Sequence, residues 1–134
     1  MSVILDTSFL IAANDSKDSN YGKASILKAK LRDKEIGQCC ISDYIFDEFV
    51  TFLKAKSFPL SAIKEFGDAL LSGEDIKILR TNESVFLQSW DLFKKSDKLS
   101  FTDCTTIILA KEFGIKNIAT FDSDFDRAGN LRRV

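Results

Sequence analysis

The hydrophobic and polar residues of the chain follow two kinds of pattern. Short apolar runs, too brief for a helix, are typical of buried strands. Such runs are found at residues 2–5, 38–41, 76–79, 117–120 and, more weakly, 131–134. Longer segments repeat apolar residues at helical spacing, which predicts amphipathic helices. These segments are residues 21–34, 42–53, 60–71, 85–95 and 100–113.

Residues with known preferences for helix ends support these boundaries. Ser42 and Ser100 are suited to capping the helices that follow them. Pro59 separates two helices, and Gly73 and Gly114 are placed to end theirs. Strands that alternate with helices predict a parallel sheet covered on both faces. We therefore expect an α/β fold with four to five parallel strands, and a single domain over residues 1–134, since the sequence contains no linker, repeat or low-complexity segment.

Composition narrows the chemistry. The chain is 45% hydrophobic and 29% charged, which is typical of a globular protein, and its net charge of −1 does not indicate nucleic-acid binding through bulk electrostatics. The absence of histidine excludes every mechanism that uses imidazole as a base or a metal ligand. The three cysteines form no C-x-x-C pair and are expected to be reduced packing residues. With no apolar run long enough to span a membrane and no signal-peptide pattern, we expect a cytoplasmic protein.

Acidic residues gather where a parallel sheet usually places its functional groups, beyond the carboxyl ends of the strands. Asp6 directly follows the first predicted strand, and Asp122 and Asp124 follow the fourth. Glu48 lies in the second turn of the helix after the second strand. Asp103 lies in the first turn of the helix that begins at Ser100. These acids are therefore expected at one edge of the sheet.

Each acid also has an ordinary structural interpretation. Asp6 is suited to capping the turn after its strand, and Ser100-x-x-Asp103 matches a capping box with Asp in place of Glu or Gln. The stretch Thr120–Asp126, TFDSDFD, is compatible with a polar turn in which Asp126 faces solvent. A calcium loop is excluded, because counting from Asp122 its sixth and twelfth positions are arginines.

Together the acids favour a metal site. Two carboxylates about 4 Å apart repel by about 4 kcal/mol at an effective dielectric constant of ~20, so four of them need a cation. Mg²⁺ or Mn²⁺ prefers oxygen ligands, activates water and stabilises phosphoryl oxygens. Without histidine, metal-activated water is the natural nucleophile. The pattern therefore favours phosphodiester hydrolysis.

Four blocks of sequence, in order and covering nearly the whole chain, resemble the signature blocks of the PIN-domain family. They are ILDTSFLIA, ISDYIFDEF, FTDCTTIILAKEFG and IATFDSDFD. The chain is most similar to the compact VapC-type toxins of toxin–antitoxin pairs. The resemblance implies a three-layer α/β/α fold, frequent homodimerisation, an antitoxin partner and a ribonuclease that depends on Mg²⁺ or Mn²⁺.

Position by position, the resemblance places the four family acids on Asp6, Glu48, Asp103 and Asp122. It makes Asp6 and Asp103 direct metal ligands, and a second ion would require Asp122 or Glu48. Three further assignments go with this set: Thr102 as a hydroxyl beside Asp103, Asp124 as a possible replacement for Asp122, and Thr7 and Ser8 as groups that position Asp6 or a water molecule.

Asp47 precedes Glu48, but on a helix it points about 100° away, so Glu48 is preferred as the catalytic acid. For RNA, basic side chains available to phosphates are Lys23, Lys28, Lys30, Arg32, Lys94, Lys95, Lys98, Arg127, Arg132 and Arg133. Two other functions stay open at this point: a housekeeping PIN nuclease that matures ribosomal or transfer RNA, and a catalytically silent PIN-like interaction module.

Overall fold

The computed structural model describes residues 1–33 and 35–134, and these build a five-stranded sheet. The strand order is β3-β2-β1-β4-β5, and each neighbouring pair is parallel. The strands are β1 (Ser2–Leu5), β2 (Gln38–Ser42), β3 (Ile76–Leu79), β4 (Asn117–Ala119) and β5 (Arg132–Arg133). The predicted parallel α/β sheet is thereby confirmed, with all five expected strands present.

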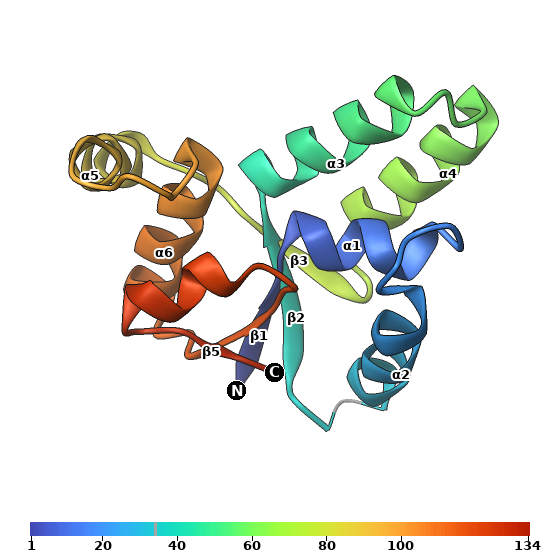
Figure 1. Ribbon diagram of the computed structural model, residues 1–134, viewed down its shortest axis with the longest axis horizontal. Coiled ribbons are helices and arrows are strands. Elements are labelled where there is room, and N and C mark those ends of the chain that lie inside the picture. Colours follow the sequence, from blue (N-terminus) through green and yellow to red (C-terminus); the bar gives the residue numbers. More distant parts are fainter. Residues whose placement is uncertain (34) are drawn as a thin grey trace.

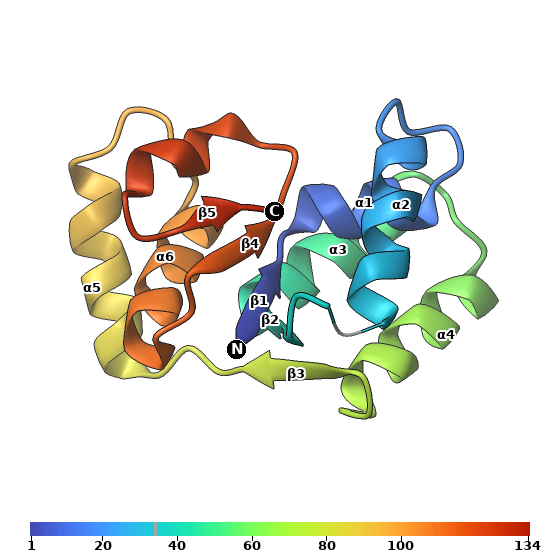
Figure 2. The same ribbon diagram turned by 90° about the horizontal axis from the view of Figure 1, so that it is seen from below.

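Helices cover both faces of this sheet, which gives the predicted three layers (Figure 1). On one side lie α1, α2, α4 and most of α3, and on the other lie α5, α6 and η1; Figure 2 shows the same layers from below. The helices are α1 (Thr7–Asn14), α2 (Tyr21–Arg32), α3 (Asp43–Ala55), α4 (Leu60–Leu71), α5 (Glu83–Lys94), α6 (Phe101–Phe113) and the 3-10 helix η1 (Ser123–Ala128).

Helix ends follow the expected chemistry. The Ile45 N–H donates to Ser42 Oγ at 3.0 Å, so Ser42 caps α3. At the other end of its helix, Gly114 adopts a left-handed conformation (φ 66°), which terminates α6 at little cost. The described part of α2 ends at Arg32, and Lys34, the last residue of the predicted helix, lies outside the described residues.

Two elements are additional to the predicted set. Helix α1 has only eight residues and no side-chain capping bond at its start, and it buries Phe9, Leu10 and Ala12 against the core. The segment interpreted as a polar turn forms η1, which is anchored by the fully buried Phe125. Helix α1 begins two residues after the end of β1 and η1 begins four residues after the end of β4, so both lie at the edge where the acids were expected.

Strand β1 occupies the centre of the sheet, between β2 and β4. Its residues Val3 and Ile4 are almost fully buried, as expected of a parallel strand covered on both faces. The three cysteines are buried and free, which agrees with their interpretation as packing residues. In the part of the chain that the structure describes, no helix is long and apolar enough to cross a membrane.

Candidate active site at the carboxyl edge of the sheet

The carboxyl ends of β1 and β4 lie side by side, since these strands pair in register with Leu5 opposite Ala119. The pairing continues one residue further, because the Asp6 N–H donates to the Ala119 carbonyl at 3.0 Å. Asp6 and Thr120, the residues that follow these two strands, therefore meet at the edge of the sheet. Both are buried, with 5% and 6% of their surfaces exposed.

Asp6 is held by two hydroxyl groups. Thr120 Oγ1 donates to Asp6 Oδ2 at 2.7 Å, and Ser8 Oγ donates to the same oxygen at 3.0 Å. Burial nevertheless raises the pKa of Asp6 above its ordinary value: it outweighs these bonds, which lower the pKa, and the charge of Asp122 raises it further. The carboxylate is thus fixed in place but short of compensating positive charge.

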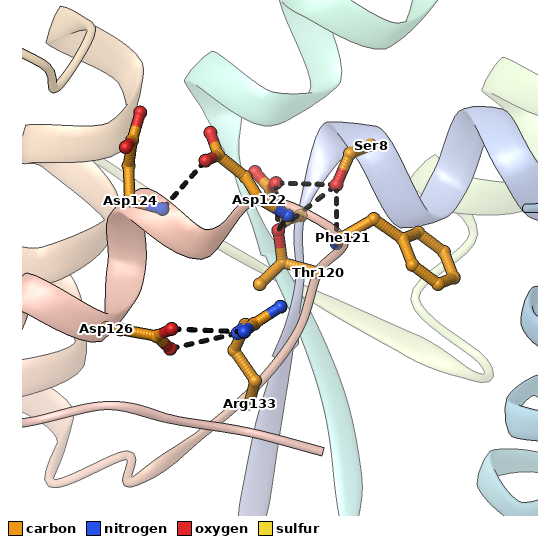
Figure 3. Close-up of polar contacts among 8 residues, drawn as sticks. Ser8, Thr120, Phe121, Asp122, Asp124, Asp126 and Arg133 are labelled. Carbon is orange, nitrogen blue, oxygen red and sulfur yellow. Dashed lines mark hydrogen bonds and ion pairs between the residues drawn. The ribbon is translucent and has the colours of Figure 1, made fainter.

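The same two hydroxyls also hold the turn after β4 (Figure 3). Thr120 Oγ1 accepts the Asp122 N–H at 3.0 Å, and Ser8 Oγ accepts the Phe121 N–H at 3.0 Å. The two oxygens lie 3.1 Å apart. The start of α1 and the turn that carries Asp122 are therefore locked together around Asp6.

Asp103 combines two roles that the sequence presented as alternatives. Its N–H donates to Ser100 Oγ at 3.1 Å, and its Oδ2 accepts the Ser100 N–H at 3.0 Å, which completes a capping box at the start of α6. Burial raises its pKa to about 6; the bonds from Ser100 oppose that rise, and the charges of Asp6 and Asp122 add to it. Asp103 therefore caps α6 and also lies within electrostatic range of the other two acids.

Asp122 and Asp124 have different surroundings. The charge of Asp122 acts on both Asp6 and Asp103. Asp122 Oδ1 accepts the Asp124 N–H at 2.9 Å, which starts η1, so Asp124 contributes its backbone to this contact. Asp126 is exposed, as expected, and forms a two-bond ion pair with Arg133 at 2.9 and 3.0 Å (Figure 3).

Glu48 is attached to the group through the residue next to Asp6. Thr7 Oγ1 donates to Glu48 Oε1 at 2.7 Å, which joins α1 to α3. Glu48 is half-buried, whereas Asp47 is exposed and accepts a bond from Thr51 in the next turn of the same helix. Thr102 is buried, and its carbonyl oxygen accepts bonds from the hydroxyls of Thr105 and Thr106.

The donor set fits a hard divalent cation. Asp6, Asp103 and Asp122 supply carboxylate oxygens and uncompensated negative charge, which is what Mg²⁺ and Mn²⁺ prefer. Across residues 1–33 and 35–134, however, no three acidic or cysteine side chains are already arranged as ligands around one point. The three aspartates thus lie within electrostatic range of one another without forming a preformed set of ligands.

Sequence reasoning missed two contributors. The sequence pattern predicts Thr120 as the end of a strand without a functional role, although a polar residue at the carboxyl end of a parallel strand is itself a signal. The second is Asp43, which accepts bonds from the hydroxyl and the N–H of Thr81 at 2.8 and 3.0 Å. This contact fixes the start of α3, the helix that carries Glu48.

A separate cavity of about 570 Å³ lies between α1, α2, α4 and the amino ends of β2 and β3. Its walls are mainly apolar and include Phe9, Leu31 and Phe66. None of the six predicted site residues lines it. The acidic edge of the sheet is thus distinct from this cavity.

Fold and site together define an α/β protein with a parallel sheet and an acidic, hydroxyl-supported cluster at its carboxyl edge. The sequence matches the PIN domain over residues 3–131, and the chain belongs to this family. This confirms the resemblance seen in the four sequence blocks.

Several individual proteins are similar over nearly the whole chain. The 23S rRNA-specific endonuclease VapC20 of Mycobacterium tuberculosis is 25% identical over 129 residues, which cover 95% of this chain and 94% of the relative. A VapC ribonuclease of Archaeoglobus fulgidus is 23% identical over 128 residues, with 93% of this chain and 80% of the relative covered.

Solved structures share the fold. The crystal structure of Mycobacterium tuberculosis VapC20, described as a Sarcin-Ricin loop cleaving toxin, matches with a TM-score of 0.84, 24% identity and 96% coverage of both chains. VapBC2 from Rickettsia felis, bound to a DNA fragment from its promoter, matches with a TM-score of 0.67 and 18% identity, covering 100% of this chain and 98% of that one. FitAcB from Neisseria gonorrhoeae matches with a TM-score of 0.61 and 16% identity, covering 98% and 95%.

Proposed function

We propose that this PIN-domain protein is an endoribonuclease that hydrolyses RNA phosphodiester bonds with Mg²⁺ or Mn²⁺, and that it is the toxin of a VapBC-type toxin–antitoxin pair. The observation that carries the proposal is the gathering of Asp6, Asp103 and Asp122 at the carboxyl edge of the sheet. The naming of its relatives as VapC ribonucleases supports the same activity.

In this proposal Asp6, Asp103 and Asp122 hold the ion. A bound Mg²⁺ or Mn²⁺ would activate water and stabilise the charge on the phosphoryl oxygens. The hydroxyls of Thr120 and Ser8 both donate to Asp6 Oδ2 and so fix the orientation of this carboxylate. Asp103 Oδ2 similarly accepts the Ser100 N–H.

Glu48 has the role of a base or orienting group, or of a ligand to a second ion. Thr7 holds one of its oxygens, so the carboxylate keeps a fixed direction without losing its second oxygen. We assign to Thr102 a hydroxyl contact with substrate or water beside Asp103. Asp124 is assigned as the acid that would replace Asp122 in its role. These assignments rest on the family resemblance, and substitution of each residue tests them.

Metal loading is expected to depend on pH. A carboxylate must be ionised to bind a cation, and the pKa of Asp103 is raised to about 6 by burial in the absence of metal. Affinity for Mg²⁺ or Mn²⁺ is therefore expected to be high above pH 7 and to fall as the pH drops through 6.

Two partners belong to the proposal. The structural neighbours include VapBC2 and FitAcB, and a cognate antitoxin that keeps this nuclease inactive is the proposed partner here. A homodimer is proposed from the family resemblance. A cytoplasmic location, where RNA and antitoxin are both present, agrees with the three free cysteines.

The rival functions make different predictions. A silent interaction module has no need for buried acids whose charges disfavour one another, as those of Asp6, Asp103 and Asp122 do. A housekeeping nuclease for ribosomal or transfer RNA would use the same site without an antitoxin. A small antitoxin-like reading frame directly upstream of the gene separates these two nucleases.

The decisive experiment is cleavage of total RNA by the purified protein with Mg²⁺, Mn²⁺ or EDTA, followed by sequencing of the new RNA ends. Cleavage is expected only with metal and is expected to disappear in Asp6→Asn. Asp126→Asn is the matched control, because Asp126 is an exposed aspartate paired with Arg133. Full cleavage by a folded Asp6→Asn variant would refute the proposal. Co-expression with the neighbouring antitoxin tests the toxin assignment, since growth inhibition is expected only without it.

A further inference from the structure

One hydroxyl group at the edge of the sheet touches two segments that carry acids. Thr120 Oγ1 contacts Asp6 Oδ2 at 2.7 Å and the Asp122 backbone nitrogen at 3.0 Å (Figure 3). Thr120 is 6% exposed and Asp6 is 5% exposed, so water has little access to replace either bond.

The direction of these bonds follows from a count of protons. A hydroxyl has one proton and two acceptor sites, while a backbone N–H can only donate. Thr120 therefore accepts from the Asp122 N–H and gives its own proton to Asp6. Ser8 has the same arrangement, since it accepts the Phe121 N–H and donates to Asp6. Every donor in the network is used when Asp6 is an ionised acceptor.

The network restricts both acids. Oδ2 of Asp6 receives two hydroxyl protons, which restricts the rotation of this carboxylate. The bond to the Asp122 N–H holds the turn from which the Asp122 side chain projects. The side chain of Asp122 caps η1 at the same time, through the Asp124 N–H. The Thr120 hydroxyl links the Asp6 carboxylate directly to the Asp122 backbone, and Ser8 makes a second link to the same turn through the Phe121 N–H.

We infer that Thr120 is a positioning residue for metal binding, whose hydroxyl ties the Asp6 carboxylate to the turn that carries Asp122. Ser8 has an auxiliary role, because its hydroxyl contacts this turn one residue earlier, at the Phe121 N–H. The inference rests on the proposed metal-dependent function. Residues that orient a ligand from behind commonly change metal affinity by ~10–100-fold when they are substituted.

The test measures Mn²⁺ affinity directly, by calorimetry and by electron paramagnetic resonance of free Mn²⁺, on purified protein freed of metal. Thr120→Val keeps the shape of the side chain and removes the hydroxyl, and it is expected to bind Mn²⁺ at least tenfold more weakly than wild type. Thr120→Ser keeps the hydroxyl and is expected to bind within about threefold of wild type. Circular dichroism checks that each variant is folded.

Thr105→Val is the matched control. Thr105 is also fully buried, but its hydroxyl donates to the Thr102 carbonyl within α6 at 2.7 Å, away from any carboxylate. This variant is expected to lose stability without a change in Mn²⁺ affinity. If Thr120→Val does not fold, Thr120→Cys replaces it, because a thiol has nearly the same size and forms only weak hydrogen bonds.

Binding of Mn²⁺ by folded Thr120→Val at wild-type affinity would overturn the inference, and so would an equal loss in Thr120→Ser. Neither result would affect the proposed ribonuclease, whose test is metal-dependent cleavage by the wild-type protein. In cleavage assays, the metal concentration for half-maximal rate is expected to rise in Thr120→Val and to be restored in Thr120→Ser. A silent wild-type protein would instead refute the proposed function, while direct Mn²⁺ binding would still decide the role of Thr120.

Discussion

Replacing Asp103 by asparagine is expected to make the metal-free protein more stable at neutral pH, although it removes a proposed metal ligand. Asn has the same shape as Asp and its amide oxygen can still accept the Ser100 N–H, so the capping box survives. What disappears is a negative charge that burial and two neighbouring acids disfavour. Stabilisation by loss of this residue is a direct sign of a site arranged for a cation.

The size of the effect follows from the pKa of Asp103. Burial raises this pKa from 3.8 to about 6, and each pH unit of difference corresponds to about 1.4 kcal/mol, or about 3 kcal/mol in all. Asp103 is only half-buried, so screening by solvent reduces this to about 1–2 kcal/mol. For 134 residues, an unfolding entropy of about 2.1 cal/mol/K per residue converts this into a melting-temperature increase of about 4–7 °C.

The sign of the pH dependence is fixed by the direction of the pKa change. Because the folded state holds the Asp103 proton more tightly than the unfolded state, the neutral form favours folding at pH values below 3.8. This contribution is lost as the pH rises from 3.8 through about 6. Asp103→Asn keeps the neutral state at every pH, so its advantage is expected to be absent near pH 3.5 and complete above pH 7.

Thermal and urea unfolding between pH 3.5 and 8, followed by circular dichroism in EDTA, measures this difference. Asp47→Asn is the control, since Asp47 is an exposed carboxylate on α3, and its melting temperature is expected to stay within about 2 °C of wild type. Lower stability of Asp103→Asn at pH 7.5 would refute the reasoning, as would an advantage that does not change with pH.

Three other measurements probe the site and its support. At ten times its dissociation constant, Mg²⁺ or Mn²⁺ is expected to stabilise the protein by about 1.4 kcal/mol, which is about 5 °C in a thermal-shift assay. Asp6→Asn is expected to lose this shift. No shift of wild type at millimolar metal would contradict the proposed metal site. Phe125→Ala, at a fully buried position in η1, is expected to cost about 3–5 kcal/mol in urea unfolding, and a cost below 1 kcal/mol would show that η1 is not an anchored element. Burial, reinforced by the charge of Asp103, raises the pKa of Cys104 to about 11, so iodoacetamide is expected to leave it unmodified at pH 8 in the native protein, and rapid labelling there would contradict this.

Much of the fold could be predicted because a parallel sheet leaves a strong trace in sequence. A strand covered on both faces must be apolar throughout, which is why residues 2–5 and 38–41 could be recognised. Helix α1 lacks comparable signals: it is short, it starts without a side-chain cap, and only three polar residues separate its apolar positions from the strand. The aspartates of η1 make its sequence resemble that of a solvated turn. Only the burial of Phe125, which the structure shows, distinguishes the two.

The sequence predicted candidate residues for the site but not the bonds between them. The rule that functional groups gather at the carboxyl ends of parallel strands led to Asp6, Asp103 and Asp122 as candidates, and their roles stay a prediction. Which hydroxyl holds which oxygen depends on side-chain placement across long separations, as with Thr7 and Glu48, 41 residues apart. Capping and charge clustering also looked like competing explanations for Asp103, whereas three-dimensional structure allows both at once.

The position of β1 in the middle of the sheet has a consequence for synthesis on the ribosome. The first strand to be made needs β4 as its neighbour, and Asp6 receives the Thr120 proton across a separation of 114 residues. At translation rates of ~5–20 residues per second, roughly 6–23 seconds pass between the synthesis of Asp6 and that of Thr120. Throughout this interval the nascent chain has Asp6 without its partner, so the acidic site cannot be complete while most of the protein is still being translated. The order of strands thereby delays any activity of this edge until the chain is nearly finished.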